Sequence, residues 1–501
     1  MTNQEKWKKL SARLDEIGAY QRTLGKLQFD MECCAPEEGM EQAGEDMSLV
    51  GKQLYKLTHA KPYQELVVQL HQDSEGLTTV QKKAVEHLYR EYARSKNVPP
   101  KLAYQVDLAQ NRAYGDWLKA KKSGDFSRFR DSFAALVDNT RKLIDLRDER
   151  HGSYYDTCLD DHEPGGSEAQ LDAFFAALKE RIVPLLRRIE REGKPIREEF
   201  LSRPCPIPVQ EELARWLLEQ EGLRESALVL MTTEHPFTEN FGPKDVRVTT
   251  HYYENAFLSN LFTVLHEGGH ALLMQNEPEE LTANHCDNWA SNAQHECVSR
   301  FYENLIGRSE AFIQFLYPKL RSLQGDPFAD VSQQELYEAV NLVRPGLIRT
   351  EADELSYCLH ILVRYELEKA FVNGEISVDQ VPALWREKYR AYLGVEVPED
   401  SRGCLQDVHW SFDYGYFPSY ALGNAYGAQI LHTMKQEFDV DQTIREGRLD
   451  RILDWMRDRV FAIASLTTPD EWIRAITGEG LNVTYYLDYL EEKFSRLYGL
   501  S

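Results

Sequence analysis

Two histidines and a glutamate lie close together in the apolar stretch FTVLHEGGHALLMQ, residues 262–275. On an α-helix, side chains four positions apart, like those of His266 and His270, lie on one face, with Cβ atoms about 5 to 6 Å apart. Two imidazoles at that spacing can bind one zinc ion, and Glu267 is placed to take a proton from a water on that ion. The pattern predicts a zinc half-site with its general base; the alternative is a buried helix with hydrogen-bonded histidines and a chance match.

The glycine pair inside this stretch favours the first reading. Gly268 and Gly269 each cost about 1 kcal/mol relative to alanine in a helix interior. An ordinary buried helix gains nothing from them. We therefore expect another part of the molecule to approach the helix backbone here, either the neighbouring strand or a substrate lying along it.

A third protein ligand is needed, because catalytic zinc sites use three and leave one position open for water. Glu296 lies in a second amphipathic stretch, NWASNAQHECVSRFYEN, 26 residues after His270. That length allows the chain to finish one helix, turn and return antiparallel beside it. We predict that Glu296 is the third ligand, although most glutamates on helices are simply solvated.

Composition excludes several classes of function. The 501 residues are 42% apolar, enough for a large core, and 58 basic against 81 acidic side chains give a net charge of −23. Such a charge opposes binding to nucleic acid or anionic lipid. The polar N-terminus lacks a signal-peptide core, and no apolar run approaches the roughly 18 residues that cross a bilayer. Eight scattered cysteines without a C-x-x-C pair are typical of reduced thiols. We expect a cytoplasmic protein without nucleic-acid or membrane partners.

Apolar residues recur with the helical period along most of the chain, which predicts a mainly α-helical fold. The predicted helices cover residues 4–28, 79–95, 100–120, 127–150, 167–190, 209–221, 255–275, 287–306, 309–323, 333–343, 351–372, 422–438 and 449–463. The exception is DVRVTTHYY, residues 245–253, whose alternation is typical of a half-buried strand, with ALVLMTTEHPF as a possible neighbour. We expect one catalytic unit, 1–501, with a helical lobe at about 1–225 and a motif-bearing lobe at about 226–501.

Several short motifs, taken together, resemble the thermostable carboxypeptidase Taq family of zinc metallocarboxypeptidases. They are HPF at 235–237, DVRVT at 245–249, HEGGH at 266–270, HE at 295–296, IRTEADE at 348–354 and GCLQDVHWSFDYGYFPSYALGNAYGAQ from Gly403. The resemblance implies long helices around a deep central groove, a small β-sheet beside the active-site helix, and a homodimer. It also implies release of single C-terminal residues from peptides, with broad preference but poor cleavage at proline or acidic ends. The cofactor would be one divalent metal ion per chain, zinc first and cobalt second.

One departure from the family pattern follows Glu296. Cys297 and Val298 stand where the family usually has serine and a small or amide residue. Glu296 itself is unaffected, but a polar role for the two positions after it is in doubt. Cys297 is also close enough in sequence to be an adventitious metal ligand.

A carboxypeptidase must also recognise the terminal carboxylate of its substrate. Arg349 is the first candidate, because a guanidinium can bind a carboxylate through two hydrogen bonds; the alternative is a surface ion pair. His235, His295 and His409 are further substrate-binding candidates, and Tyr420 can donate to a developing oxyanion unless it is a core residue. Gln406 and Asp407 belong to the QDVHW motif, and Asp407 can orient His409 or a ligand, or cap a helix.

Two other functions share parts of this pattern. An oligopeptidase or dipeptidyl carboxypeptidase of the same zinc class would use the same ligands and a similar helical groove but would cut further from the end. A non-catalytic helical peptide-binding protein would carry a degenerate metal site. The motifs after residue 348 disfavour the first alternative, and intact His266, Glu267, His270 and Glu296 disfavour the second.

Overall fold

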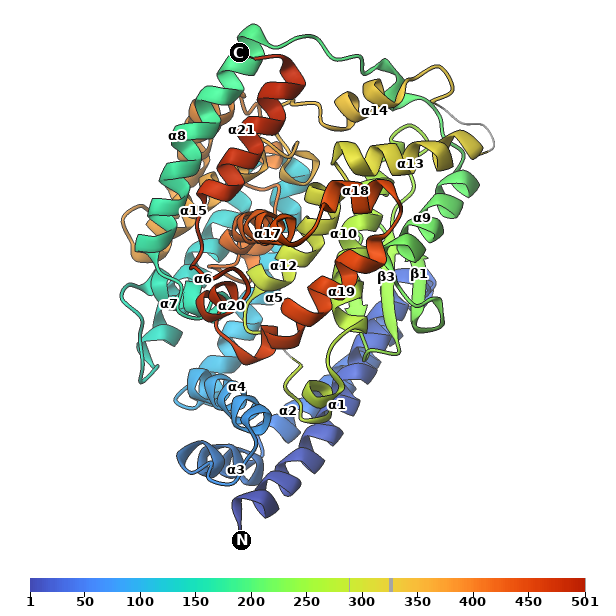
Figure 1. Cartoon of the computed structure of the whole chain (residues 1–501). Coiled ribbons are helices and arrows are strands. Elements are labelled where there is room, and N and C mark those ends of the chain that lie inside the picture. Colours follow the sequence, from blue (N-terminus) through green and yellow to red (C-terminus); the bar gives the residue numbers. More distant parts are fainter. Residues whose placement is uncertain (288, 324–327, 501) are drawn as a thin grey trace.

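A computed structural model describes residues 1–287, 289–323 and 328–500 (Figure 1). The fold is mainly α-helical with one small sheet, as the sequence predicts. In the described part of the chain, none of the helices combines the length and the apolar character that crossing a membrane requires. In the described residues none of the eight cysteines forms a disulfide bond.

The chain before the sheet is helical. Its helices are α1 (Asn3–Cys33), α2 (Met40–Thr58), α3 (Lys61–Gln72), α4 (Thr79–Ser95), α5 (Pro100–Ser123), α6 (Ser127–Asp145), α7 (Tyr154–His162), α8 (Glu168–Glu192) and α9 (Ile207–Glu221). Several begin with a side-chain cap, as in α4, where Thr78 and Gln81 form the reciprocal bonds of a capping box.

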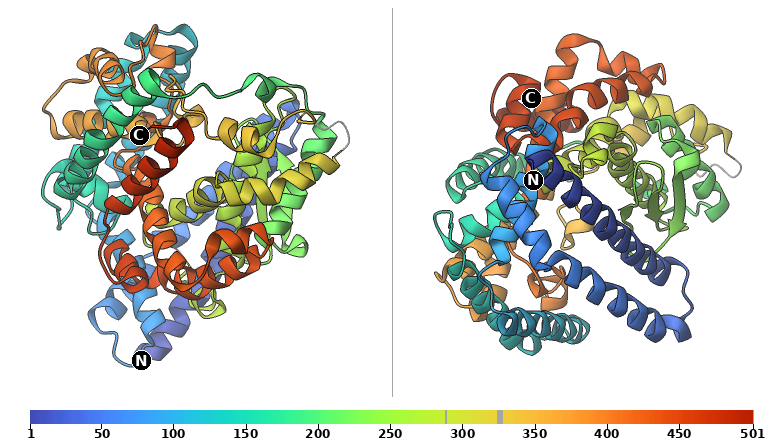
Figure 2. Two further views of the ribbon diagram at one scale, coloured as in Figure 1. Left: turned by 45° about the horizontal axis from the view of Figure 1, so that its top comes forward. Right: turned by 90° about the horizontal axis from the view of Figure 1, so that it is seen from below.

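Helices also make up most of the chain after the sheet. They are α10 (Phe257–Gln275), α11 (Glu279–Ala283), α12 (Asn292–Arg300), the π-helix η4 (Phe301–Ile306), α13 (Glu310–Ser322), α14 (Gln333–Val340), α15 (Tyr357–Asn373), α16 (Val381–Leu393), α17 (Pro418–Glu437), α18 (Val440–Arg445), α19 (Leu449–Arg459), α20 (Pro469–Thr477) and α21 (Thr484–Tyr498). Figure 2 shows two further views of these elements.

The sheet has three short strands in the order β1-β3-β2. β1 (Leu228–Thr232) runs parallel to β3 (Val246–Thr250), and β2 (Thr238–Asn240) runs antiparallel to β3, with Thr238 opposite Val248. The predicted strand and its neighbour are therefore present. The strand ends at Thr250, earlier than predicted, because the chain then leaves the sheet to begin α10 at Phe257.

Helices α10, α12 and α17 lie side by side in the middle of the molecule (Figure 1). Glycines let both neighbours approach α12 at backbone distance. A Cβ built on Gly269 of α10 would lie 2.7 Å from the Cα of Ser299, and one built on Gly423 of α17 would lie 2.8 Å from the Cβ of Glu296. No side chain larger than hydrogen fits at either contact, so α12 is held between two helix backbones.

The two glycines of α10 thus allow neighbouring helices to approach its backbone. Our prediction that they face the neighbouring strand is wrong. Gly269 faces α12, while a Cβ on Gly268 would collide with the carboxylate of Glu221 at the end of α9. Glu221 is buried and neither of its oxygens has a hydrogen-bond partner in the described residues. Burial raises the pKa of this carboxyl well above its usual value, which favours the neutral form.

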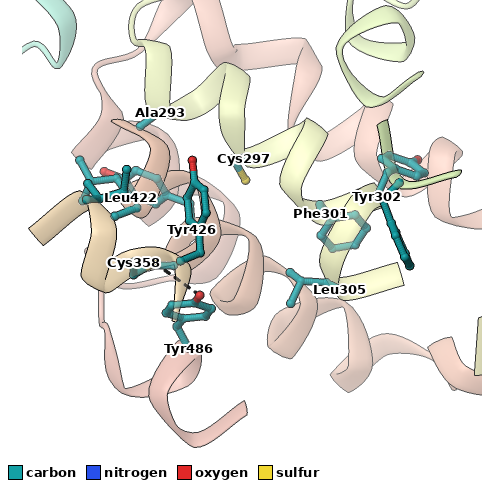
Figure 3. Packing of buried hydrophobic residues seen from close by; sticks show 14 of the residues in the cluster. Ala293, Cys297, Phe301, Tyr302, Leu305, Cys358, Leu422, Tyr426 and Tyr486 are labelled. Carbon is teal, nitrogen blue, oxygen red and sulfur yellow. Dashed lines mark hydrogen bonds between the residues drawn. The ribbon is translucent and has the colours of Figure 1, made fainter. Parts of the chain in front are cut away.

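One large apolar cluster joins both halves of the chain, with members from Ala113 to Tyr498. Figure 3 shows the part of it around α12, where the side chains of Cys297, Phe301, Tyr426 and Tyr486 pack together. A smaller cluster around Trp7 joins α1, α3 and α4. The division into two lobes near residue 225 stays a prediction, since the large cluster contains residues from both sides of it.

The helix predicted over 287–306 begins later, at Asn292, and consists of two elements; residue 288 of that prediction lies outside the described residues. Regular α12 ends at Arg300 and the wider turns of the π-helix follow from Phe301 to Ile306. A π-helix shifts the side chains after it relative to an α-helix, and such insertions are frequent at functional sites. The apolar pattern is continuous through the segment, so periodicity alone does not reveal this change.

Replacing Gly423 by alanine tests the close contact between α17 and α12. The new methyl group must push against backbone and Cβ atoms of α12, so we expect a loss of about 1 to 3 kcal/mol in the free energy of unfolding, measured by chemical denaturation. Gly115→Ala is the matched control: it lies in helix α5, and a Cβ there meets nothing within 4 Å. The control should be neutral or stabilising, by up to about 1 kcal/mol. Equal effects of the two substitutions would contradict the close contact.

Candidate metal centre and substrate groove

His266, His270 and Glu296 come together where α10 and α12 cross, with one potential ligand atom of each residue within 4.8 Å of the others. Nε2 of His270 lies 3.9 Å from Oε1 of Glu296. Within the described residues this is the one group of three or more histidine, cysteine or acidic side chains that can hold a metal ion. Cys297 is not part of it, because its side chain points into the apolar core (Figure 3).

Both histidines use their Nδ1 atoms for other hydrogen bonds. Nδ1 of His266 lies 2.9 Å from Oε2 of Glu303, and Nδ1 of His270 lies 2.6 Å from Nδ1 of His295. Nε2 of each ring is left available for a metal ion. Metal-binding histidines usually have such a partner on the second nitrogen, which fixes the ring orientation. Two imidazoles and a carboxylate therefore form a donor set that fits zinc.

The charges around the centre shift the pKa values of the two histidines in opposite directions. Burial and neighbouring positive charges lower the pKa of His270 well below its usual value, so it is neutral, as a ligand must be. Burial opposes the proton on His266 as well, but the carboxylate of Glu303 outweighs it and raises that pKa. Partial burial opposes the charge on Glu303, yet Arg300 and His266 lower its pKa to about 2, which keeps it ionised.

Glu267 is held by the sheet. The hydroxyl of Thr238 in β2 lies 2.6 Å from Oε2 of Glu267 and 3.0 Å from its backbone carbonyl oxygen. Burial raises the pKa of the Glu267 carboxyl, against the opposing effects of His266 and the Thr238 hydrogen bond. A carboxylate with a raised pKa is better matched to proton transfer near neutral pH.

A cavity of about 1140 Å³ opens in front of the centre and contains the predicted groove. His266 and Glu267 line it together with Arg300, Glu303 and Tyr357. Other parts of the cavity are lined by Glu198, Glu199, Leu201, Ser202, residues 234–236, Leu342, Arg344 and residues 349–352. Arg349 and His235 are among the lining residues, whereas His295, His409 and Tyr420 are not.

Arg349 is buried, and hydrogen bonds fix its position. Its Nε atom donates to Oδ1 of Asp407 at 3.0 Å, and its backbone nitrogen donates to Oε1 of Gln406 at 2.9 Å. Asp407 also accepts a hydrogen bond from Nε of Arg364 at 2.7 Å. Despite burial, the two arginines hold the pKa of Asp407 well below its usual range.

Asp407 of the QDVHW motif therefore accepts hydrogen bonds from Arg349 and Arg364, and does not bind His409 as one of our sequence interpretations has it. His409 lies with its Nε2 atom 3.3 Å from the hydroxyl of Tyr420. Burial, together with the charges of Arg349 and Arg364, lowers the pKa of His409 to about 4. The guanidinium of Arg349 lies over the ring of Tyr420, with its Cζ atom 4.8 Å from the ring centroid.

Arg300 and Tyr357 connect the metal centre to Arg349. Arg300 donates to Oε2 of Glu303 and to the hydroxyl of Tyr357, both at 2.8 Å, and its Nε atom lies 3.6 Å from Oε2 of Glu296. Nη1 of Arg349 donates to the same Tyr357 hydroxyl at 3.2 Å. Two cations thus share one phenol oxygen between the two ends of the site.

Sequence reasoning missed four of these residues: Thr238, Arg300, Glu303 and Tyr357. For Arg300 a signal exists, since it follows Glu296 by four residues, which places the two side chains on one helical face. Glu303 lies beyond the change to the π-helix, which the apolar pattern does not reveal. Thr238 and Tyr357 come from other elements, and only the tertiary structure brings them to the site.

Comparison of this chain with known proteins identifies its family. A family model described as carboxypeptidase Taq (M32) metallopeptidase matches residues 9–494. Carboxypeptidase 1 of Bacillus subtilis is 36% identical over 489 residues, 97% of each chain. Thermostable carboxypeptidase 1 of Thermus thermophilus is 36% identical over 498 residues, 96% of this chain and 97% of that protein. The crystal structure of an M32 carboxypeptidase from Deinococcus radiodurans superposes with a TM-score of 0.95 at 28% identity, covering 99% and 100% of the two chains.

Glu303→Gln tests the partner of His266. The amide keeps the shape but removes the charge that faces His266 and Arg300, so we expect metal affinity to fall about 10- to 100-fold, measured by competition with a chromophoric chelator. Glu351→Gln, in the same cavity but outside these contacts, is the matched control and should bind metal like the parent. Unchanged affinity in Glu303→Gln would remove Glu303 from the metal centre.

Proposed function

Because this chain belongs to the carboxypeptidase Taq (M32) metallopeptidase family, whose members are metal-dependent carboxypeptidases, we propose that it releases single C-terminal amino acids from peptides. Its specificity would be broad, with poor cleavage at proline or acidic ends. The observation that carries the proposal is the convergence of His266, His270 and Glu296 beside a groove that also contains the buried cation Arg349.

The proposed ligands of one divalent ion are Nε2 of His266, Nε2 of His270 and the carboxylate of Glu296. Zinc is the first candidate for this donor set and cobalt the second. When bound, such an ion polarises a scissile carbonyl group and lowers the pKa of coordinated water to about 7. Glu303 and His295 would hold the two imidazoles in orientation through their Nδ1 atoms.

Glu267 would be the general base and acid. It takes a proton from the attacking water and later delivers it to the nitrogen of the leaving amino acid. The Thr238 hydroxyl orients the carboxylate, because its hydrogen bond to Oε2 fixes one oxygen and leaves Oε1 for the water. The raised pKa supports this role, since the group must accept and return one proton in each cycle.

Arg349 would bind the terminal carboxylate of the substrate. Its Nε and Nη2 atoms face Asp407, so the substrate would meet the Nη1 side, next to the Tyr357 hydroxyl. Asp407 and Gln406 position the guanidinium. Tyr420 lies against the guanidinium, and we propose that it and His409 support Arg349 or donate to the substrate oxygen. His235 lines the groove and would contact bound peptide.

The two alternatives differ from this function in testable ways. A dipeptidyl carboxypeptidase or oligopeptidase would release longer products, and a peptide-binding protein would release none. The carboxypeptidase relatives along nearly the whole chain favour single-residue release. We further propose that the protein acts in the cytoplasm as a homodimer, with each chain a single catalytic unit.

Glu267→Gln tests the general base. The amide cannot accept the proton of the attacking water, so kcat should fall by at least about a thousandfold. Metal content, measured by atomic emission after dialysis, should stay at the parent value, because Glu267 is not a ligand. Activity near the parent value would refute the assignment.

Arg349→Ala tests carboxylate recognition with a pair of blocked dipeptides, one with a free C-terminal acid and one amidated. Loss of a charge-assisted hydrogen bond should lower kcat/KM for the acid by about 10- to 100-fold more than for the amide. Arg344→Ala is the control, because this arginine lines the same cavity and its side chain is 67% exposed. Equal losses for acid and amide would contradict the role of Arg349, and failure of the parent enzyme to release one amino acid from the acid would contradict the function itself.

A further inference from the structure

The hydroxyl of Tyr357, the first residue of α15, lies between two arginines that line the groove. Nη2 of Arg300 donates to the phenol oxygen at 2.8 Å, and Nη1 of Arg349 donates to it at 3.2 Å. A guanidinium has donors and no acceptor, so the phenol oxygen is the acceptor in both hydrogen bonds. Both of its acceptor positions are therefore occupied, and its own proton must point elsewhere.

This proton has no acceptor among the residues that the structure describes, where the hydroxyl makes only the two hydrogen bonds from the arginines. Burial raises the pKa of Tyr357 above its ordinary value, although Arg300 and Arg349 oppose the shift, so the phenol keeps its proton at neutral pH. The ring packs in the large apolar cluster, and Tyr357 lines the groove as both arginines do. A desolvated donor without an acceptor is unfavourable, so this O–H calls for a ligand atom that accepts.

We propose that Tyr357 is a substrate-binding residue, whose O–H donates to the terminal carboxylate of the peptide beside Nη1 of Arg349. The inference rests on the proposed function and deepens it, because it gives the carboxylate a second donor. It also assigns Arg300 a part in the same site: by occupying one acceptor position of the phenol oxygen, Arg300 directs the proton of Tyr357 toward the substrate.

The contacts favour the terminal carboxylate over the scissile carbonyl as the acceptor. Nε and Nη2 of Arg349 face Asp407, at 3.0 and 2.9 Å from its Oδ1 atom, so Nη1 is the part of this guanidinium that is left for substrate. The Tyr357 oxygen is 3.2 Å from that atom, and donors so close together can serve one carboxylate group. On the other side, the guanidinium of Arg300 separates the hydroxyl from Glu296, since its Nε atom lies 3.6 Å from Oε2 of this potential metal ligand.

A site of this kind distinguishes a chain end from a peptide bond. The donors that meet the substrate are the Nη1–H of Arg349 and the O–H of Tyr357, both suited to carboxylate oxygens. A C-terminal amide, or a chain that continues, presents an N–H group at this point. The phenol oxygen cannot accept it, because the two arginines already occupy its acceptor positions. An unpaired polar group in a desolvated site is a strong ground for rejection.

Tyr357→Phe tests the donor, because it removes the hydroxyl and keeps the ring. With the blocked dipeptide acid, kcat/KM should fall about 10- to 100-fold, since a hydrogen bond to a charged group is lost. The loss for the amidated dipeptide should be at least about fivefold smaller. Most of the change should be in KM, because the carboxylate is bound equally in the ground state and the transition state. Tyr253→Phe is the matched control: this tyrosine lines the same cavity at 45% exposure and should stay within about twofold of the parent.

Tyr357 also holds the two arginines, and a second comparison separates donation from positioning. In an Arg349→Ala background there is no Arg349 left to position. If the O–H of Tyr357 itself binds the carboxylate, Tyr357→Phe should lower kcat/KM for the acid by at least about threefold further in that background. The metal content of Tyr357→Phe, measured by atomic emission after dialysis, should equal that of the parent, because the contacts of Arg300 with Glu303 and Glu296 do not involve the hydroxyl.

Two results would overturn the proposal: equal losses for acid and amide in Tyr357→Phe, or no further loss in the Arg349→Ala background. Neither affects the proposed function as long as the parent releases one amino acid from the acid. A parent that releases no single amino acid would refute the proposed function, and this inference with it.

Discussion

The site depends on one packing constraint: α12 is held at backbone distance between α10 and α17. Gly269 lets α12 approach the helix that carries both histidines, and Gly423 lets α17 approach the backbone of Glu296 itself. Because no side chain separates these helices, the carboxylate of Glu296 reaches the two imidazoles from a neighbouring element. Close packing transmits even small displacements, so a methyl group at either contact is expected to move a potential metal ligand.

A continuous network of charged and hydrogen-bonded side chains, buried or partly buried, extends from this point. Glu303 and Arg300 connect His266 to the hydroxyl of Tyr357, and Tyr357 connects them to Arg349. Asp407 then neutralises Arg349 and Arg364 together. Buried charges are tolerated when they are paired and hydrogen-bonded, and such networks fix side chains in one arrangement. The proposed carboxylate-binding group is thereby held in a fixed position relative to the proposed metal ligands.

The features that the sequence predicts are those that depend on the local spacing of residues along a helix. His266, Glu267 and His270 lie on one helix, so their spacing alone places them, and Glu296 followed from a second amphipathic stretch. The π-helix after Arg300 was missed, because the apolar pattern continues through it, and with it the role of Glu303. The partners of Gly268 and Gly269 were assigned wrongly, since a glycine indicates that something approaches but not which element does. Asp407 was linked to its near neighbour His409, whereas its hydrogen bonds run to Arg349 and Arg364, which are distant in sequence.

Anomalous scattering at the zinc edge, from crystals of metal-loaded protein, tests the central claim most directly. We predict one strong peak per chain, about 2.0 to 2.2 Å from Nε2 of His266, Nε2 of His270 and a carboxylate oxygen of Glu296. A peak bound elsewhere, or one that contacts the histidines while Glu296 remains out of reach, would contradict the metal centre formed by α10 and α12.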